Sequence, residues 1–221
     1  NNNTRNLYFE GEDPVYYNHT VQNNTVNGLP VYYYFNQKNL VLSGLGTKHV
    51  TLANCSNITV RNMNTTKGDP IYIMWTNNST LYNNTAEWND IGIAVYFSNN
   101  NNIGNNTISN NNLTVSSGEP GGSSGIQLVF SSGNFIYNNT ADSNTLGIFV
   151  AFSDNTKISN NMIRNNAMTG IYLSSSSFGN LTLNSMSNNG MNLLVIGFDP
   201  SNYNHSIDTT NSVSYTHLRA H

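Results

Sequence analysis

Hydrophobic residues recur along this chain in a short unit that can be aligned eight times. The first apolar positions of the units are Val31, Val50, Ile71, Ile93, Ile126, Ile148, Ile171 and Leu193. Apart from one long interval between Ile93 and Ile126, successive first positions are nearly evenly spaced. A repeat of about 22 residues indicates an array of stacked structural units.

Each unit opens with the alternation that is typical of a β-strand. After Ile126, for example, Leu128 and Phe130 are apolar at positions +2 and +4, and most units follow the same pattern. We therefore expect positions 0, +2 and +4 to face a core, and positions +1 and +3 to face outward. Two shorter apolar columns follow. They are Leu81, Ile103, Ile136, Ile158 and Leu181 at +10, and Ala86, Ile108, Ala141, Ile163 and Met186 at +15.

Asparagine occupies two further columns, where the chain is expected to turn. These residues are Asn84, Asn106, Asn139, Asn161 and Asn184 at +13, and Asn89, Asn111, Asn144, Asn166 and Asn189 at +18. Asparagine tolerates left-handed backbone angles, which suits a sharp corner. Stacked asparagine amides can also hydrogen-bond to one another along a column. Glycine precedes the first position in four units, at Gly92, Gly125, Gly147 and Gly170. We interpret it as a second type of residue that lets the backbone turn sharply.

A chain that turns three corners in each unit and returns to the same column is a parallel β-helix. The sequence therefore predicts an all-β solenoid of about eight coils, with about 4.8 Å between neighbouring coils. A leucine-rich repeat has a similar period, but it needs a helix or a leucine-rich convex side. Good helix formers are scarce between the apolar columns, which favours the β-helix.

The pattern divides the chain into four parts. Residues 30–199 hold the repeats, and Pro30–Phe35 aligns with Pro70–Trp75 as the first strand. Residues 1–29 are expected to form a cap, with short strands at 7–9 and 15–17 that shield the first coil from water. The long fourth interval carries an insertion around 112–124, which we expect to bulge from a corner.

The segment after the last repeat echoes the segment before the first. Tyr203-Asn204-His205-Ser206-Ile207 matches Tyr17-Asn18-His19-Thr20-Val21, and with a slip of a single position the match continues to Val213 against Val26. Residues 200–213 are therefore interpreted as the start of a second, truncated module. Residues 214–221 differ in composition and resemble a translated sequencing adaptor, so we treat them as a non-native tail.

Composition narrows the functional classes. Only 9% of the residues are charged and the net charge is −3, so nothing suggests a nucleic-acid partner. No apolar run is long enough to span a membrane. The chain does not begin with methionine, and we interpret it as a fragment whose signal peptide and anchor lie elsewhere. The single cysteine, Cys55, is expected to be a small half-buried residue, with a reactive thiol as the alternative.

An aromatic face is the first candidate site. Tyr32, Tyr72, Phe149 and Tyr172 occupy position +1, and Tyr34 and Tyr96 occupy position +3. Outward-facing aromatic rings can stack on sugars, with neighbouring Asn and Ser as hydrogen-bonding groups. The alternative is that tyrosine fills these positions because it favours β-strands.

Carboxylates supply the second candidate site. Glu87, Asp142 and Arg164 share position +16 in three coils, and we expect Asp142 and Arg164 to form an ion pair. Glu87 and Asp142 lie two coils apart, about 9.6 Å, which is near the upper limit for an inverting glycosidase. The acidic residues around Glu12 are interpreted as a solvated turn or a calcium site. The histidines and methionines form no metal-binding cluster, so we expect no metal and no cofactor.

Two stretches carry a resemblance to a known family. Gly125-Ile126-Gln127-Leu128 with Ile136-Tyr137-Asn138-Asn139 resembles the repeats of NosD-like and related carbohydrate-binding and sugar-hydrolase (CASH) domains. The stretch from Tyr17 to Tyr34 is similar to modules of archaeal cell-surface β-helix proteins. The resemblance implies right-handed coils, an extracellular or cell-surface location and neighbouring β-helix modules. The NosD name is associated with a copper centre, but we find no set of copper ligands in this sequence.

Together these features favour a non-enzymatic surface module that acts as a spacer and binds a polysaccharide or surface glycan through its aromatic face. The alternative is a polysaccharide hydrolase or lyase that uses Glu87, Asp142 and Arg164.

Overall fold

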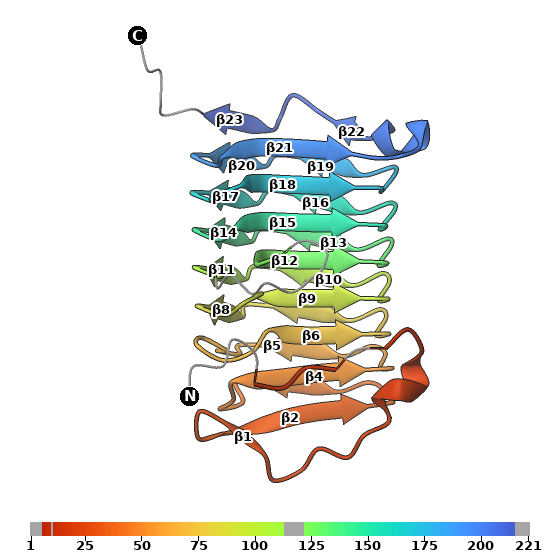
Figure 1. The fold of residues 1–221 in the computed structure, drawn as a ribbon, viewed down its shortest axis with the longest axis vertical. Coiled ribbons are helices and arrows are strands. Elements are labelled where there is room, and N and C mark those ends of the chain that lie inside the picture. The colour runs from red at the N-terminus through yellow and green to blue at the C-terminus, as the bar shows by residue number, and fades with distance from the viewer. Residues whose placement is uncertain (1–5, 10, 113–121, 215–221) are drawn as a thin grey trace.

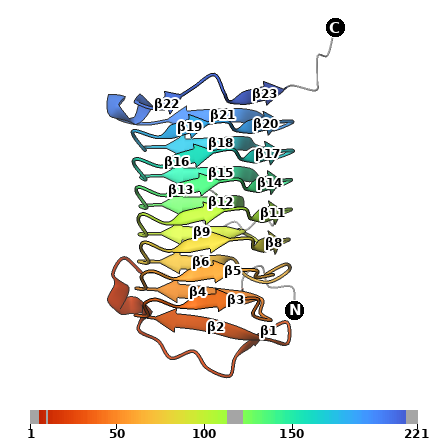
Figure 2. The same cartoon turned by 180° about the vertical axis from the view of Figure 1, so that it is seen from behind.

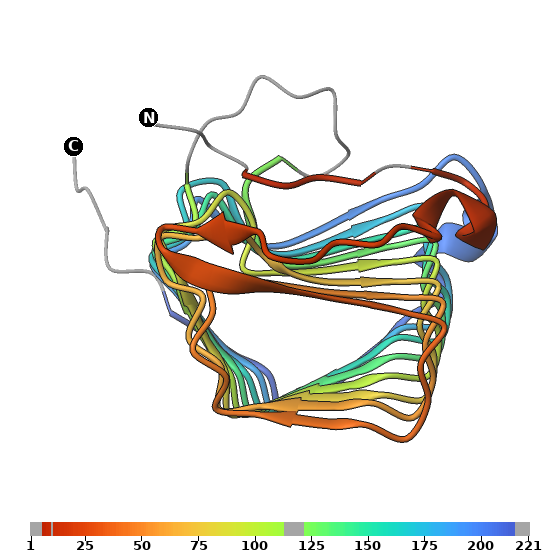
Figure 3. The same ribbon diagram turned by 90° about the horizontal axis from the view of Figure 1, so that it is seen from below.

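The computed structural model describes residues 6–9, 11–112 and 122–214, and within these residues nearly all regular structure is β-strand. The strands stack into a column with three sheets along its sides (Figure 1, and from behind in Figure 2). Successive coils pair in parallel throughout, which confirms the predicted all-β solenoid. Figure 3 looks along the column and shows the coils lying over one another around one core.

The three sheets differ in strand length. The first sheet has nine strands, in the order β1 (Thr25–Val26), β2 (Leu29–Phe35), β4 (His49–Ala53), β6 (Ile71–Met74), β9 (Ile93–Tyr96), β12 (Ser124–Val129), β15 (Leu146–Ala151), β18 (Thr169–Ser174) and β21 (Met191–Ile196). The second has eight, in the order β22 (Ser206–Ile207), β19 (Asn180–Thr182), β16 (Lys157–Ser159), β13 (Phe135–Tyr137), β10 (Asn102–Gly104), β7 (Thr80–Tyr82), β5 (Thr59–Arg61) and β3 (Val41–Ser43). The third has six, in the order β23 (Ser212–Ser214), β20 (Ser185–Ser187), β17 (Met162–Arg164), β14 (Thr140–Asp142), β11 (Thr107–Ser109) and β8 (Thr85–Glu87).

The predicted apolar columns form the core. Ile126 pairs with Ile93 on one side and Ile148 on the other, and all three are fully buried. The +10 and +15 columns are equally in register, for example Ile103 with Ile136 and Ile108 with Ala141. Burying such branched side chains contributes about 1.5–3 kcal/mol each, so this column of stacked residues is the main source of stability.

The first coil is aligned one residue away from its predicted register. Tyr32, not Val31, pairs with Val50, and Tyr34 pairs with Leu52. A run of consecutive apolar residues offers the same alternation in both registers, and a shift by one residue reverses every side chain. Tyr34 therefore packs against the core cluster, although it was predicted to face outward.

The predicted asparagine ladder is present, but it does not turn the corners. The backbone N–H and Nδ2 of Asn106 both donate to Oδ1 of Asn139, at 2.9 Å each, and Asn139 donates in the same way to Asn161. The left-handed residue is the one before each ladder position, such as Asn105 and Asn138. The ladder residues thus satisfy buried backbone groups at the corners, while their exposed neighbours supply the unusual backbone angle.

The glycine column likewise serves close packing. Gly92, Gly125, Gly147 and Gly170 have no left-handed φ. A Cβ at Gly125 would lie 2.6 Å from the carbonyl oxygen of Gly147 and 3.0 Å from Nδ2 of Asn144. Glycine is required there because the next coil passes too close for a side chain, and not because the backbone turns.

The N-terminal segment, described at residues 6–9 and 11–18, does not form the predicted pair of strands. We call this segment the strap. Residues 7–9 form no strand, and residues predicted as a second strand lie in the 3₁₀ helix η1 (Pro14–Tyr17). A second 3₁₀ helix, η2 (Pro200–Tyr203), follows β21. The strap crosses the outer face of the first sheet near β4 and β6, as Figures 1 and 3 show in red. The predicted insertion around 112–124 falls mostly on 113–121, which lie outside the described residues.

Candidate functional site

Four aromatic rings form a ladder on the outside of the column. Trp75, Phe97, Phe130 and Phe152 occupy position +4 of four consecutive coils, and we call them the aromatic column. Their ring centroids are 4.6, 5.2 and 5.0 Å apart, with planes within 15° of parallel. Phe130 and Phe152 are 48% and 46% exposed, which is unusual for phenylalanine. Stacking covers much of each ring face, so the column presents a ridge of ring edges.

Position +4 was predicted to face the core, and this prediction is wrong. The four aromatic residues have φ values of 50–53°, in the left-handed region. A left-handed residue interrupts the strand, so alternation no longer decides where its side chain points. The backbone N–H groups still bond to the neighbouring coil, as from Phe130 to the carbonyl of Ala151 at 3.1 Å.

Most of the predicted tyrosine face is unavailable in this structure. Tyr72 is 1% exposed and Phe149 is 3% exposed, so neither is the open ring expected at position +1. Tyr72 lies beneath the N-terminal strap, with Tyr8 at 6.3 Å between ring centroids. Tyr96 and Tyr172 remain partly exposed on the outer face as predicted.

The positions of Tyr32 and Tyr34, the other two residues of the predicted face, result from the shifted register of the first coil. Tyr32 and Tyr34 share the phase of the inward residues Val50 and Leu52, and their rings stack on each other at 6.4 Å. The outward residue in this coil is Tyr33, which packs against Phe9 of the strap at 4.8 Å. The predicted set of six aromatic residues is therefore split between the two sides of the sheet.

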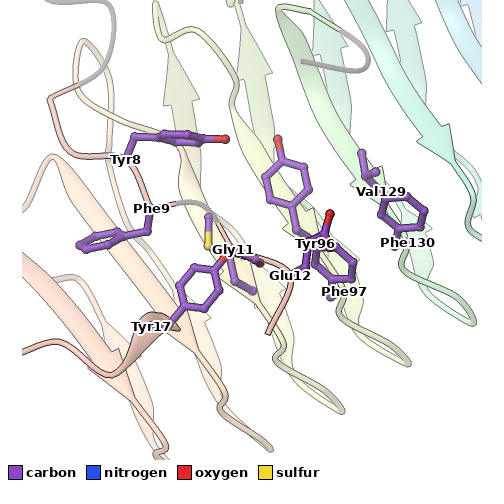
Figure 4. A pocket seen from close by; sticks show the side chains of 10 residues that line it. Tyr8, Phe9, Gly11, Glu12, Tyr17, Tyr96, Phe97, Val129 and Phe130 are labelled. Atoms are coloured by element: carbon purple, nitrogen blue, oxygen red, sulfur yellow. Dashed lines mark hydrogen bonds between the residues drawn. The ribbon is translucent and has the colours of Figure 1, made fainter. Parts of the chain in front are cut away.

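A small pocket opens between the strap and the aromatic column (Figure 4). It has a volume of about 180 Å³, below the roughly 300–1,000 Å³ of pockets for drug-sized ligands. Its lining residues are mostly aromatic or apolar: Tyr8, Phe9, Gly11, Glu12, Tyr17, Met74, Tyr96, Phe97, Val129 and Phe130. Among the described residues that line the pocket, Glu12 is the only carboxylate and none is lysine or arginine. A single uncharged ring with an apolar face suits this space.

A buried polar array anchors the strap to the sheet. Nδ1 of His49 lies 2.8 Å from Oδ2 of Asp69, and Nε2 of His49 lies 2.8 Å from the Thr51 hydroxyl. All three residues are fully buried, and Oδ1 of Asp69 accepts a 2.8 Å hydrogen bond from the backbone of Asn6. Sequence reasoning missed this array, because His49 and Asp69 belong to different coils and no local motif links them.

A family model described as a right-handed β-helix region matches residues 49–219. The chain belongs to the right-handed β-helix family. No curated protein sequence matches this right-handed β-helix. The described residues contain no helix that is both long and apolar enough to cross a membrane.

Several solved structures share this right-handed β-helix fold. The periplasmic alginate epimerase AlgG matches with a TM-score of 0.56 and 18% identity, and one of its point mutants with a TM-score of 0.58. Each match covers 83% of this chain but only 46% of the epimerase. The A-module of the Azotobacter vinelandii mannuronan C-5 epimerase AlgE6 matches at 14% identity, over 80% of this chain and 52% of that one, with a TM-score of 0.44. At 18% identity the two AlgG matches show the fold alone.

The predicted carboxylate set is held in the third sheet of this β-helix. Nε of Arg164 donates to Oδ2 of Asp142 at 2.9 Å, which confirms the predicted ion pair. The other Asp142 oxygen accepts hydrogen bonds from Asn165 and Ser143.

The surroundings of Asp142 lower the pKa of its carboxyl group. Burial opposes ionisation of this group, but the hydrogen bonds and the Arg164 charge outweigh the effect of burial. Glu87 accepts a 2.8 Å hydrogen bond from Ser109, in the coil between them. A lowered pKa favours the ionised form of Asp142, which accepts hydrogen bonds in this structure.

The two remaining candidates are the acidic group around Glu12 and the thiol of Cys55, and both lie in ordinary structural environments. Oδ1 of Asp13 accepts a hydrogen bond from the backbone of Val15 and so caps η1, while Glu10 of the same acidic group lies outside the described residues. Cys55 is 3% exposed, more buried than expected, and burial raises the pKa of its thiol. A thiol with a raised pKa forms little of the reactive thiolate.

Proposed function

We propose that this chain is an exported, non-enzymatic β-helix module that binds an extended neutral polysaccharide along the aromatic column. The observation that carries the proposal is the left-handed backbone of Trp75, Phe97, Phe130 and Phe152. Bulky residues rarely adopt this conformation, and each such residue costs about 1–2 kcal/mol relative to ordinary backbone angles. Their retention at four successive corners therefore calls for a compensating role.

The other corners give a direct comparison. At the corner between the second and third sheets, the left-handed residues in five successive coils are asparagines: Asn62, Asn83, Asn105, Asn138 and Asn160. The fold therefore does not demand aromatic residues at a left-handed corner. Ring stacking can offset part of the backbone cost, at about 0.5–1.5 kcal/mol per pair. Stacking alone does not explain why the exposed ridge continues into the apolar pocket beside Phe97 and Phe130.

The surface has the shape and polarity of a carbohydrate-binding ridge. The column spans three coil steps, about 14 Å at 4.8 Å per coil, so an extended chain can contact several rings. C–H groups of sugars pack against aromatic edges, and the pocket accepts one ring against Tyr96 and Phe97. A neutral chain is favoured over a polyuronate because the pocket offers a carboxylate and no cation.

The comparisons support a polysaccharide as the class of ligand. The two AlgG structures reported above, with TM-scores of 0.56 and 0.58, are named as a periplasmic alginate epimerase, so this fold is used on a polysaccharide in that protein. The chain spans less than half the length of that epimerase. The proposal also includes the NosD-like or CASH subtype, which rests on the repeat residues 125–128 and 136–139. It includes an archaeal cell-surface origin as well, which rests on residues 17–34.

The test replaces two residues of the aromatic column by asparagine, the residue that five coils carry at the corner between the second and third sheets. Phe130→Asn with Phe152→Asn keeps a side chain that accepts the left-handed backbone, and it removes the exposed rings. We expect about a tenfold weaker affinity for soluble neutral glucan or xylan in affinity electrophoresis, because two ring contacts of about 0.5–1.5 kcal/mol each are lost.

Phe178→Asn is the matched control. Phe178 is also left-handed and 54% exposed, but it lies on a different corner. Binding should be unchanged by this substitution. Equal binding by the double variant and the parent chain would refute the aromatic column as the binding surface. Release of new reducing ends, abolished by Asp142→Ala, would favour the hydrolase or lyase alternative instead.

A further inference from the structure

The two ends of the chain repeat each other over a longer stretch than the Tyr-Asn-His motif. At the same offset in residue number, the N-terminal strap matches the end of the last coil. The matched pairs are Asn6 with Asn192, Leu7 with Leu193, Gly11 with Gly197, Asp13 with Asp199 and Pro14 with Pro200. Residues 6–26 thus correspond to residues 192–213, which include most of β21, η2, β22 and most of β23.

The central part of the two copies has the same local structure. Asp13 caps η1 by accepting a 2.8 Å hydrogen bond from Val15, and Asp199 caps η2 in the same way from Ser201. The residue after each helix has nearly the same backbone angles, φ −78° and ψ 73° at Asn18 and φ −84° and ψ 78° at Asn204. The repeated sequence therefore specifies one conformation at this turn.

The C-terminal copy continues the solenoid. β21 pairs in parallel with β18, β22 with β19, and β23 with β20. Asn211 also extends the asparagine ladder, because the backbone N–H and Nδ2 of Asn184 donate to its Oδ1 at 3.1 and 2.9 Å. This copy therefore adds one strand to each of the three sheets.

Among the described residues, the N-terminal copy is placed differently from the C-terminal copy. Its counterpart of β21 crosses the outer face of the first sheet, and its counterpart of β23 is β1, which pairs antiparallel with β2. Asn24, the counterpart of the ladder residue Asn211, is exposed and donates to the nearby carbonyl of Gln22. An open cleft of about 490 Å³ lies between residues 6–9 and residues 19–26.

We propose that residues 6–26 are a joining coil, and that the N-terminal edge formed by β2 and β3 receives this coil from a preceding β-helix module. The register already fits, because the interval from Val21 to Leu42 equals that from Val50 to Ile71, a single turn of the array. Val21 then stacks on Leu42, as Ile207 stacks on Leu181 at the other end. The partner is therefore a module of the same fold. Its last coil would pair with the β2 edge, so that this edge would no longer be exposed.

This inference is independent of the carbohydrate proposal, but the two meet at one surface. When residues 6–9 take the place of β21 in a joining coil, they leave the outer face of β4 and β6. Tyr72 and the His49–Asp69 pair, which the strap now covers, then become accessible. The uncovered face adjoins the aromatic column through Met74 and Tyr96.

A direct fusion of two copies tests the proposal. Residue 213 of the first copy is joined without a linker to residue 27 of the second, so that Val213 takes the place of Val26. Ser206 of the first copy should then lie one coil from Val41 of the second, about 4.8 Å away, which permits a disulfide. We expect Ser206→Cys in the first copy and Val41→Cys in the second to cross-link rapidly under mild oxidation.

The matched control pairs Ser206→Cys with Thr59→Cys, which lies one coil further on. The separation is then about 9.6 Å, too far for a disulfide without backbone movement. A second control inserts a flexible glycine–serine linker after residue 213, which should slow cross-linking of the first pair at least tenfold. Equal cross-linking of both pairs, or none in the direct fusion, would overturn the proposal. Carbohydrate binding is not measured, so this result is independent of the proposed function.

Discussion

Two corner columns of this solenoid share a left-handed backbone but carry opposite side chains. One column is asparagine in five successive coils, and the other is tryptophan or phenylalanine in four. The asparagine column is tied by amide hydrogen bonds, such as the 2.6 Å bond from Asn160 to Asn138. The aromatic column is tied by ring contacts, such as Phe97 on Phe130 at 5.2 Å. The coil fixes the backbone angle at both places, so the backbone angle alone does not decide which type of side chain each column carries.

The comparison also separates two jobs that asparagine performs. Exposed asparagines such as Asn138 provide left-handed backbone angles, while the next residue in each coil, such as Asn139, hydrogen-bonds inside the column. Only the exposed position can be given to another residue type without losing buried hydrogen bonds. This explains why aromatic residues replace the exposed corner residue and leave the inner polar residues, such as Ser98 and Ser131, in place.

The largest effect is expected at the inner asparagine ladder. Asn139→Ala removes the acceptor for the backbone and side chain of Asn106 and leaves the carbonyl of Ile103 without its 2.8 Å donor. We expect a loss of about 3 kcal/mol in the free energy of unfolding, because buried groups lose their partners. The measurement is urea unfolding followed by circular dichroism.

Asn138→Ala is the control for this prediction. It places a β-carbon at the same left-handed φ of 53° but leaves the inner ladder intact. A cost of about 1 kcal/mol is expected from the backbone alone. Equal costs for the two substitutions would show that the ladder adds nothing beyond the corner.

A smaller effect is expected when side chains are exchanged between the two columns. Asn105→Phe puts a single ring at a left-handed corner without stacking partners, and should cost about 1–2 kcal/mol. Phe130→Asn loses two ring contacts but gains a residue suited to the backbone, so we expect a change within about 1 kcal/mol. The same unfolding assay measures both. A loss at Phe130→Asn of about 3 kcal/mol or more, twice the roughly 1.5 kcal/mol upper value for one ring pair, would mean that the aromatic column exists for stability and not for binding.

The apolar columns could be predicted because they depend on alternation alone. Ile126, Ile148 and Ile171 lie where the pattern places them, since each stacks on the same position of the next coil. The same rule failed at Phe130, because its left-handed φ reverses the side chain and a hydrophobicity pattern contains no information about φ. A sequence signal for the outer column does exist: an aromatic residue recurs at the end of four consecutive strands of the first sheet, at a corner where the neighbouring coils carry Asn54 and Ser175.

Contacts between distant segments could not be predicted. Tyr72 occupies an outward position in its strand, but Tyr8 and its neighbours in the strap cover it. The shifted register of Tyr32 had a different cause, since the run of apolar residues from Val31 to Phe35 offers two equally good alternations. Of the candidate chemistry, only the Asp142–Arg164 pair was found from the sequence, because stacking brings equivalent positions of neighbouring coils together.

The smallest effect is expected at that ion pair, whose side chains are 20% and 46% exposed. The pKa of Asp142 is lowered in the folded state, so its stabilising contribution is present above the ordinary carboxyl value of 3.8 and is lost as the pH falls through the lowered folded value. Asp142→Asn should therefore reduce the free energy of unfolding at pH 7 by at most about 1 kcal/mol. The gap to the parent chain should close as the pH falls below 3.8. Asp154→Asn serves as the comparison, because Asp154 accepts a 2.7 Å hydrogen bond from the backbone of Ser177 in place of a bond from an arginine. A gap at Asp142 that persists in acid would mean that its hydrogen bonds to Asn165 and Ser143, and not its charge, hold this corner.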